Sequence, residues 1–108
     1  MSTDPYIYII SESVDGPVKI GFSADPDRRL KQLQTGHSGA LTVHYKQEVI
    51  AENVKALERI IHRTLAHKRS RGEWFTISTE DAILEVKHAV MRYGDIENLS
   101  ARARSRTI

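Results

Sequence analysis

Two short motifs in the first half of the chain carry polar side chains that could do chemistry. Tyr6-Ile7-Tyr8 and Lys19-Ile20-Gly21 each lie in an apolar, β-branched run, and the turn sequence Asp15-Gly16-Pro17 separates them. Alternation with a period of two predicts strands over 6–10 and 18–22, paired as a hairpin. A glycine inside a strand marks a bulge or a close approach by another group. Tyr8 and Lys19 are therefore predicted to form the floor of a small polar site.

A carboxylate is predicted at the border of the core in the second half of the chain. The segment 51–67 has one apolar helical stripe, and Glu58 lies at the edge of that stripe. His62 follows one turn later on the same polar flank. A carboxylate that faces the sheet suits a hard divalent cation such as Mg²⁺, which keeps most of its waters. The alternative is a surface glutamate paired with Arg59, His62 or Arg63.

A third candidate is an arginine on the helix predicted over 25–35. Arg29 lies about 40° around the helix from Leu33, which faces the core, whereas Arg28 lies about 140° away. Arg29 is thus the arginine that can lie along the sheet and reach inward. A guanidinium there can hold a phosphate through two hydrogen bonds and stabilise charge that grows in a transition state. The alternative is a partly buried structural arginine.

The other elements predict how these residues are held. A third strand is expected over 41–46, with Leu41, Val43 and Tyr45 on one face. The segment 69–72 is expected to be a loop and 73–77 to be extended, with Trp74 and Phe75 as core anchors. A last helix opens at a capping box over 78–81 and ends at Gly94. The order β-β-α-β-α-α predicts a small α+β sandwich around a central three-stranded, mainly antiparallel sheet flanked by helices.

Length and composition indicate one globular domain. The chain has 108 residues, of which 40% are hydrophobic and 28% charged. We expect the domain to span 1–95 and a basic, flexible C-terminal tail to span 96–108. The absence of cysteine excludes disulfides, thiolate metal sites and a cysteine nucleophile. The N-terminal apolar run is too short for a membrane span and lacks a basic leader, so a cytoplasmic, intracellular location is expected.

The basic residues are clustered although the net charge is only +2. Clustered Lys and Arg can neutralise phosphates and release counterions, which favours a nucleic-acid partner. One cluster lies at 28–31, a second at 67–71 and a third at 102–106. The alternative is a set of solvated faces and a mobile tail. The side chains expected to contact nucleic acid are Arg28, Lys31, Lys68, Arg69 and Arg71.

Taken together, these motifs resemble the GIY-YIG endonuclease superfamily, especially a phage-associated branch in which the second motif is Lys-Ile-Gly. The matching segments are Tyr6-Ile7-Tyr8, Lys19-Ile20-Gly21, Arg29-Leu30, Leu57-Glu58 with His62, and Gly72-Glu73-Trp74-Phe75. The resemblance covers nearly the whole chain outside the tail. It implies hydrolysis of a nucleic-acid phosphodiester with a divalent metal, Mg²⁺ or Mn²⁺, leaving a nick.

The resemblance also implies residue roles. Tyr8 matches the tyrosine that activates or positions the attacking water, Arg29 the arginine that binds the scissile phosphate, and Glu58 the metal-binding carboxylate. Two positions depart from the family pattern, because Lys19 replaces the second-motif tyrosine and Leu33 replaces a histidine. Lysine cannot reproduce a phenol unless its own pKa is lowered. A histidine could supply the lost base, and the two candidates are His44 and His62.

Two functions of different classes follow from these residues. The first is a DNA-nicking endonuclease, with RNA as an alternative substrate, that uses Tyr8, Lys19, Arg29, Glu58, His44 and His62. The second is a nucleic-acid-binding module of the same fold that has lost catalysis. A protein-interaction domain without a nucleic-acid role has little positive support. The sequence does not predict an oligomeric state.

Overall fold

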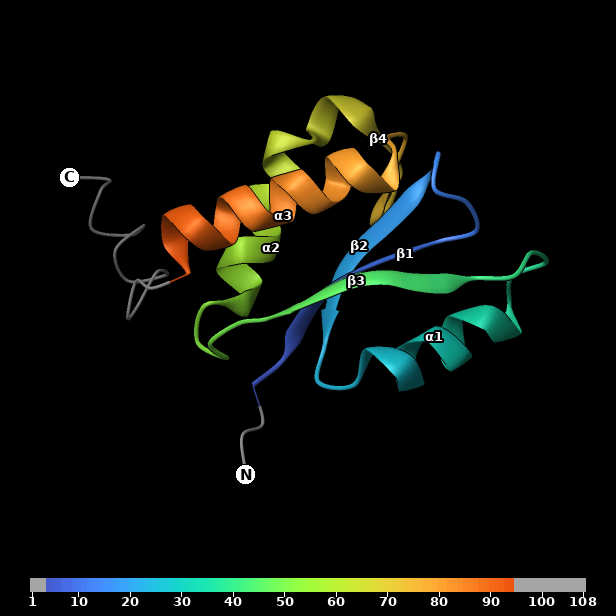
Figure 1. Ribbon diagram of the computed structural model, residues 1–108, viewed down its shortest axis with the longest axis horizontal. Coiled ribbons are helices and arrows are strands. Elements are labelled where there is room, and N and C mark those ends of the chain that lie inside the picture. The colour runs from blue at the N-terminus through green and yellow to red at the C-terminus, as the bar shows by residue number, and fades with distance from the viewer. Residues whose placement is uncertain (1–3, 95–108) are drawn as a thin grey trace.

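A five-stranded antiparallel sheet forms the middle layer of the computed structural model, and helices cover both of its faces (Figure 1). The structure describes residues 4–94. The strand order is β3-β1-β2-β5-β4. Along the chain the elements are β1 (Tyr6–Ser11), β2 (Val18–Ser23), α1 (Pro26–Thr35), β3 (Thr42–Glu48), α2 (Val54–Thr64), the 3₁₀ turn η1 (Ala66–Lys68), β4 (Arg69–Arg71), β5 (Trp74–Phe75) and α3 (Thr79–Tyr93).

The α+β class is confirmed, but the sheet has five strands where three were predicted. The two additional strands are β4 and β5, which lie in segments predicted as a loop and as one extended run. β5 pairs with β2 through Val18 with Phe75 and Lys19 with Trp74, and β4 pairs with β5. Strands of two and three residues are too short to show alternation, so their pairing is set by tertiary contacts rather than by a readable pattern.

The two faces of the sheet bury two separate cores. On one face α2 and α3 cover the larger core, whose buried members include Ile7, Ile9, Val18, Ile20, Leu57, Ile61, Phe75, Ala82 and Val86. On the other face α1 covers a smaller core of Tyr8, Ile10 and Leu41, with Leu30, Leu33, Val43 and Trp74 packed against it. Phe75 is fully buried as predicted, whereas Trp74 is only half-buried.

A bulge in β3 changes which of its residues share a face. Ile10 pairs with Val43 and Ile9 pairs with Tyr45, so His44 is an extra residue between two consecutive pairs. Because the bulge shifts the alternation, Val43 packs in the smaller core and Tyr45 packs against the larger one. The prediction that these two side chains share a face is therefore wrong.

The helix boundaries agree with the sequence signals at most ends. The Asp25 side chain accepts a hydrogen bond from the Arg28 backbone N–H, Pro26 opens α1, and Gly36 follows its end. The helix predicted over 51–67 is shorter, because residues 51–53 form a turn and the chain tightens into η1 after Leu65.

Ser78 caps the start of α3 by accepting a hydrogen bond from the Asp81 N–H, and Gly94 follows its end. No helix within residues 4–94 combines the length and apolar character that crossing a membrane requires. The predicted basic tail over 96–108 lies outside the described residues.

Candidate active site at the edge of β2

Gly21 is the point at which the candidate polar groups meet. The β1–β2 register places it opposite Tyr8. A Cβ atom on Gly21 would lie 2.6 Å from Tyr8 Oη and 2.9 Å from Glu73 Oε1. The absence of a side chain therefore leaves room for a phenol from β1 and a carboxylate from the β4–β5 turn. The prediction that this glycine marks a close approach by another group is confirmed.

Lys19 and Glu73 form an ion pair beside this point. Lys19 Nζ lies 3.1 Å from Glu73 Oε1, and the Lys19 side chain is only 10% exposed. The same ammonium lies 5.9 Å from the centre of the Trp74 ring, its cross-strand neighbour. A buried ammonium is costly unless it is paired, and Glu73 is the partner that compensates for its burial.

Glu58 reaches the site from α2, which packs against β2. His62, one helical turn later, lies with Nε2 at 2.8 Å from the Ile20 carbonyl oxygen, and its ring packs on Phe75. Since a carbonyl oxygen can only accept, His62 Nε2 is the donor. This contact ties the polar flank of α2 to the β2 backbone and holds Glu58 beside Lys19 and Glu73, with which it interacts electrostatically.

Arg29 completes the group from α1. Its guanidinium lies near enough to the Tyr8 hydroxyl to favour the ionised phenol, and it donates a hydrogen bond to Gln32 Oε1 at 3.2 Å. Burial raises the pKa of Tyr8 above 10.0, and the negative charges of Glu73 and Glu58 raise it further, whereas Arg29 acts in the opposite direction. The phenol is therefore protonated near neutral pH and can donate a hydrogen bond.

Glu58 is held in an unusual state for a carboxyl group. Burial raises its pKa from 4.5 to about 7, the nearby charge of Glu73 adds to this rise, and Lys19 opposes it. When Glu58 and Glu73 are both ionised, neither carboxylate can donate a hydrogen bond to the other. The Glu58 Oε2 atom is buried and has no hydrogen-bond partner. An unpaired buried carboxylate oxygen of this kind is a fitting ligand for a hard cation such as Mg²⁺. Within residues 4–94 no group of three or more His, Cys, Asp or Glu side chains could hold a metal ion.

The structure thus brings four of the predicted residues together: Tyr8, Lys19, Arg29 and Glu58 surround one point at the β2 edge. His62 adjoins them but is engaged with the backbone. His44 is not part of this group, because it lies on β3, with β1 between β3 and β2. Its Nε2 atom is buried without a hydrogen-bond partner.

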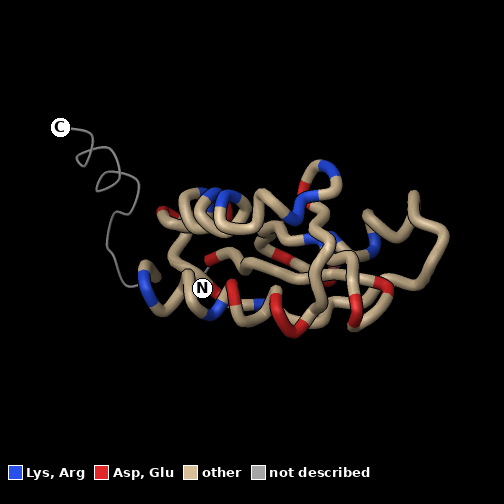
Figure 2. The backbone as a smooth tube through the Cα atoms, turned by 90° about the horizontal axis from the view of Figure 1, so that it is seen from above, with Lys and Arg blue, Asp and Glu red and all other residues tan. Residues whose placement is uncertain are grey.

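The predicted nucleic-acid contacts lie in two separate segments of the chain, one on α1 and one spanning η1 and β4. Arg28 and Lys31 are exposed on α1, and Lys68, Arg69 and Arg71 are exposed on η1 and β4. The Arg69 guanidinium lies over the Phe75 ring at 5.5 Å. Figure 2 shows basic and acidic residues interspersed along the described part of the chain.

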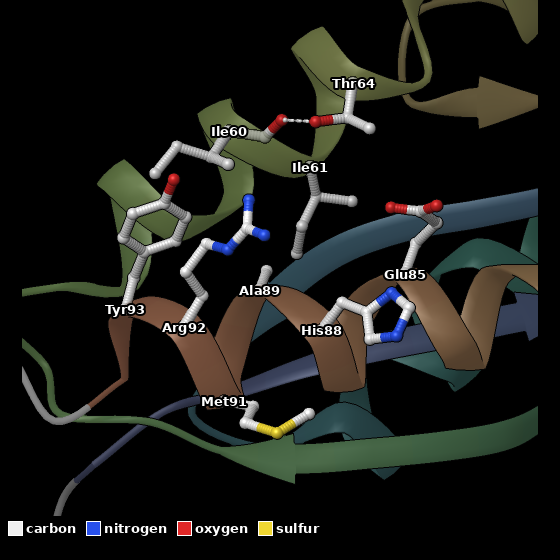
Figure 3. A pocket seen from close by; sticks show the side chains of 9 residues that line it. All are labelled: Ile60, Ile61, Thr64, Glu85, His88, Ala89, Met91, Arg92 and Tyr93. Carbon is white, nitrogen blue, oxygen red and sulfur yellow. Dashed lines mark hydrogen bonds between the residues drawn. The ribbon is translucent and has the colours of Figure 1, made fainter.

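A hollow between α2 and α3 does not coincide with these residues. It has a volume of about 430 Å³ and is lined entirely by side chains of α2 and α3, including Ile60, His88 and Tyr93 (Figure 3). α2 and α3 cover the face of the sheet opposite α1, so this hollow is separate from the Tyr8 hydroxyl. We assign the site on the convergence of polar groups rather than on the size of a hollow.

Glu73 is the site residue that the sequence reasoning missed. It lies in the Gly72-Glu73-Trp74-Phe75 segment, which carried the family resemblance but gave no role to its carboxylate. Its place follows from the pairing of β5 with β2, and a two-residue strand gives no sequence signal for that pairing. The signal that was available is Lys19 itself, because a lysine within an apolar strand requires a nearby counter-charge if its ammonium is buried.

Comparison with known proteins gives one family. Residues 5–91 match the T5orf172 domain, a phage-associated domain related to nucleases of the GIY-YIG and HNH types. No curated protein and no solved structure matches the chain.

Proposed function

The chain belongs to the T5orf172 domain family, and on that premise we propose that it is a divalent-metal-dependent endonuclease of the GIY-YIG type that nicks DNA. One observation carries the proposal: a phenol, a guanidinium, an ammonium and a carboxylate meet where Gly21 leaves space at the β2 edge. Hydrolysis of a phosphodiester needs water, phosphate and a cation held together, and no single residue supplies all three.

Each residue has a role that follows from its surroundings. Arg29 reaches the Tyr8 hydroxyl from α1, so its remaining N–H donors are placed to bind two oxygens of a phosphate. The Tyr8 hydroxyl, protonated near neutral pH, orients the attacking water by a hydrogen bond. Glu58 Oε2 would hold the cation, Mg²⁺ or Mn²⁺. When bound, such a cation polarises the phosphate and lowers the pKa of a bound water.

Nicking of a supercoiled plasmid tests this proposal. Wild-type protein is assayed with Mg²⁺, with Mn²⁺ and with excess chelator, beside Glu58→Gln. The matched control is Glu85→Gln, which removes a carboxylate on α3 that lines the hollow between α2 and α3, away from the candidate site. We expect metal-dependent nicking by wild type and by the control, and a rate at least about a hundredfold lower in Glu58→Gln. Absence of metal-dependent nicking, or equal nicking by Glu58→Gln, would count against the proposal.

A second function is favoured by the ion pair of Lys19. Its ammonium takes the place of the second-motif tyrosine and is bound to Glu73, so it lacks the proton chemistry of a phenol. The alternative is a nucleic-acid-binding module without catalysis. It predicts binding to duplex DNA or RNA that persists in chelator and weakens steeply with salt. Fluorescence anisotropy with labelled oligonucleotides at several salt concentrations distinguishes it from the nuclease.

A further inference from the structure

The backbone holds Glu73 in place more firmly than its position in a turn would imply. The Glu73 carbonyl accepts a hydrogen bond from the Ile20 N–H at 3.0 Å, which continues the β2–β5 ladder by one residue. Its carboxylate then lies above Gly21, where Oε1 is 2.9 Å from the position of a Cβ atom. Glu73 is thus aimed at the same point as Tyr8 by backbone pairing.

Three charged groups meet at this point with an imbalance of charge. The carboxylates of Glu58 and Glu73 interact with each other, and the Lys19 ammonium faces both of them. With both carboxylates ionised, one ammonium leaves one negative charge uncompensated in a partly buried site. The Glu58 Oε2 atom carries part of this uncompensated charge, because it is buried and has no hydrogen-bond partner. A hard cation that keeps several waters is typically held by one or two carboxylates.

We infer that Glu73 is a second oxygen ligand of the divalent cation, together with Glu58, and that the Lys19 ammonium opposes the cation's binding. This inference rests on the proposed function and deepens it, because it makes the cation site a pair of carboxylates from α2 and from the β4–β5 turn. A purely structural ion pair between Lys19 and Glu73 is the competing explanation. If Glu73 is a cation ligand, removing its carboxylate weakens metal affinity and removing the Lys19 ammonium strengthens it, whereas a purely structural ion pair predicts that neither change alters metal affinity.

Binding of Tb³⁺ separates them without an activity measurement. Lys19 Nζ lies 5.9 Å from the Trp74 ring, so Trp74 is close enough to the site to sensitise emission from a bound Tb³⁺ ion. Displacement of the bound Tb³⁺ by added Mg²⁺ then gives the affinity of the site for Mg²⁺. The variants are Glu73→Gln and Lys19→Met, with Glu85→Gln as the matched control. Thermal melts of each variant establish that it is folded.

We expect Glu73→Gln to weaken the affinity at least about tenfold, because a ligand is lost. Lys19→Met should strengthen it about tenfold, because a positive charge near the cation is removed. The control should bind as wild type does. Wild-type affinity in a folded Glu73→Gln would overturn the inference. If Glu73→Gln does not fold, Lys19→Met decides the question, and unchanged or weaker binding in that variant overturns it.

Plasmid nicking measured in parallel separates this inference from the proposed function. Metal-dependent nicking by wild type, combined with wild-type affinity in Glu73→Gln, rejects the second ligand and leaves the nuclease intact. A wild-type protein that neither binds Tb³⁺ nor nicks DNA rejects both.

Discussion

Glu58→Gln should make the protein more stable at neutral and alkaline pH, although it removes a residue of the candidate site. In the metal-free protein the Glu58 carboxyl is buried beside Glu73, and these surroundings raise its pKa from 4.5 to about 7. Above that pH the fold must hold an ionised carboxylate whose Oε2 atom has no hydrogen-bond partner. Glutamine has a similar shape, is neutral at every pH, and its amide can donate to Glu73 as protonated Glu58 can.

The size and sign of the effect follow from proton linkage. A raised pKa means that the folded state binds the proton more tightly than the unfolded state does. The stabilisation from that proton is complete below pH 4.5 and is lost as the pH rises through about 7. Each pKa unit corresponds to about 1.4 kcal/mol, so the wild type should lose at most about 3.5 kcal/mol of unfolding free energy across this range. At pH 8 the variant should be more stable by up to this amount, and near pH 4.5 the two should be alike.

Urea unfolding at pH 4.5, 6, 7 and 8 in excess chelator measures the difference. Comparing the variant with wild type at each pH cancels the titration of groups that the two proteins share. Glu85→Gln reports what the loss of a carboxylate on α3, outside the candidate site, does by itself. A difference between Glu58→Gln and wild type that does not grow with pH, or a variant less stable than wild type at pH 8, would refute the reasoning. Such a result would identify Glu58 as a structural ion-pair partner.

Two further predictions concern the floor and the core of the site. Gly21→Ala should lower the free energy of unfolding by about 1–3 kcal/mol and reduce nicking at least about tenfold, because the new methyl group displaces the Tyr8 hydroxyl and the Glu73 carboxylate. A thermal melt and a nicking assay check these two effects, and wild-type activity would contradict the prediction. Phe75→Ala should cost about 3–5 kcal/mol, and Trp74→Ala about half as much because that ring is only half-buried. Chemical denaturation checks the order, and a larger loss in Trp74→Ala would show that its ring is the main anchor.

The parts of the fold that were predictable have long, regular signals. The hairpin was visible in two alternating runs around a glycine-proline turn, and the helix predicted over 25–35 agrees with α1 to within one residue. The apolar stripe of α2 correctly predicted its buried face. The parts that were missed depend on single residues. One extra residue, His44, reverses the faces of β3, and the β4–β5 hairpin is too short for a period to be counted.

The same distinction applies to the candidate site. Helical spacing placed Glu58 at the edge of a buried stripe and Arg29 on the inward side of α1, because an angle around a helix follows from sequence separation alone. Alternation along the first strand likewise predicted which face of the sheet the Tyr8 side chain lies on, because that face also follows from sequence separation alone. No spacing rule connects His44 with Glu58, since their distance depends on strand order, and the order β3-β1-β2 separates them.

Lys19 and Glu73 show why the departure from the family pattern is best considered as a change of two residues. A lysine in the second motif would leave an ammonium almost fully buried, which is stable only beside an opposite charge. The Glu73 carboxylate is that opposite charge. The backbone hydrogen bond from the Ile20 N–H to the Glu73 carbonyl holds Glu73 beside the Lys-Ile-Gly motif. Lys-Ile-Gly and Gly-Glu-Trp-Phe are therefore one structural unit, although they are far apart in the sequence. Exchanging Lys19 for tyrosine alone would leave Glu73 without its ammonium, so restoring the family's motif requires both positions to change together.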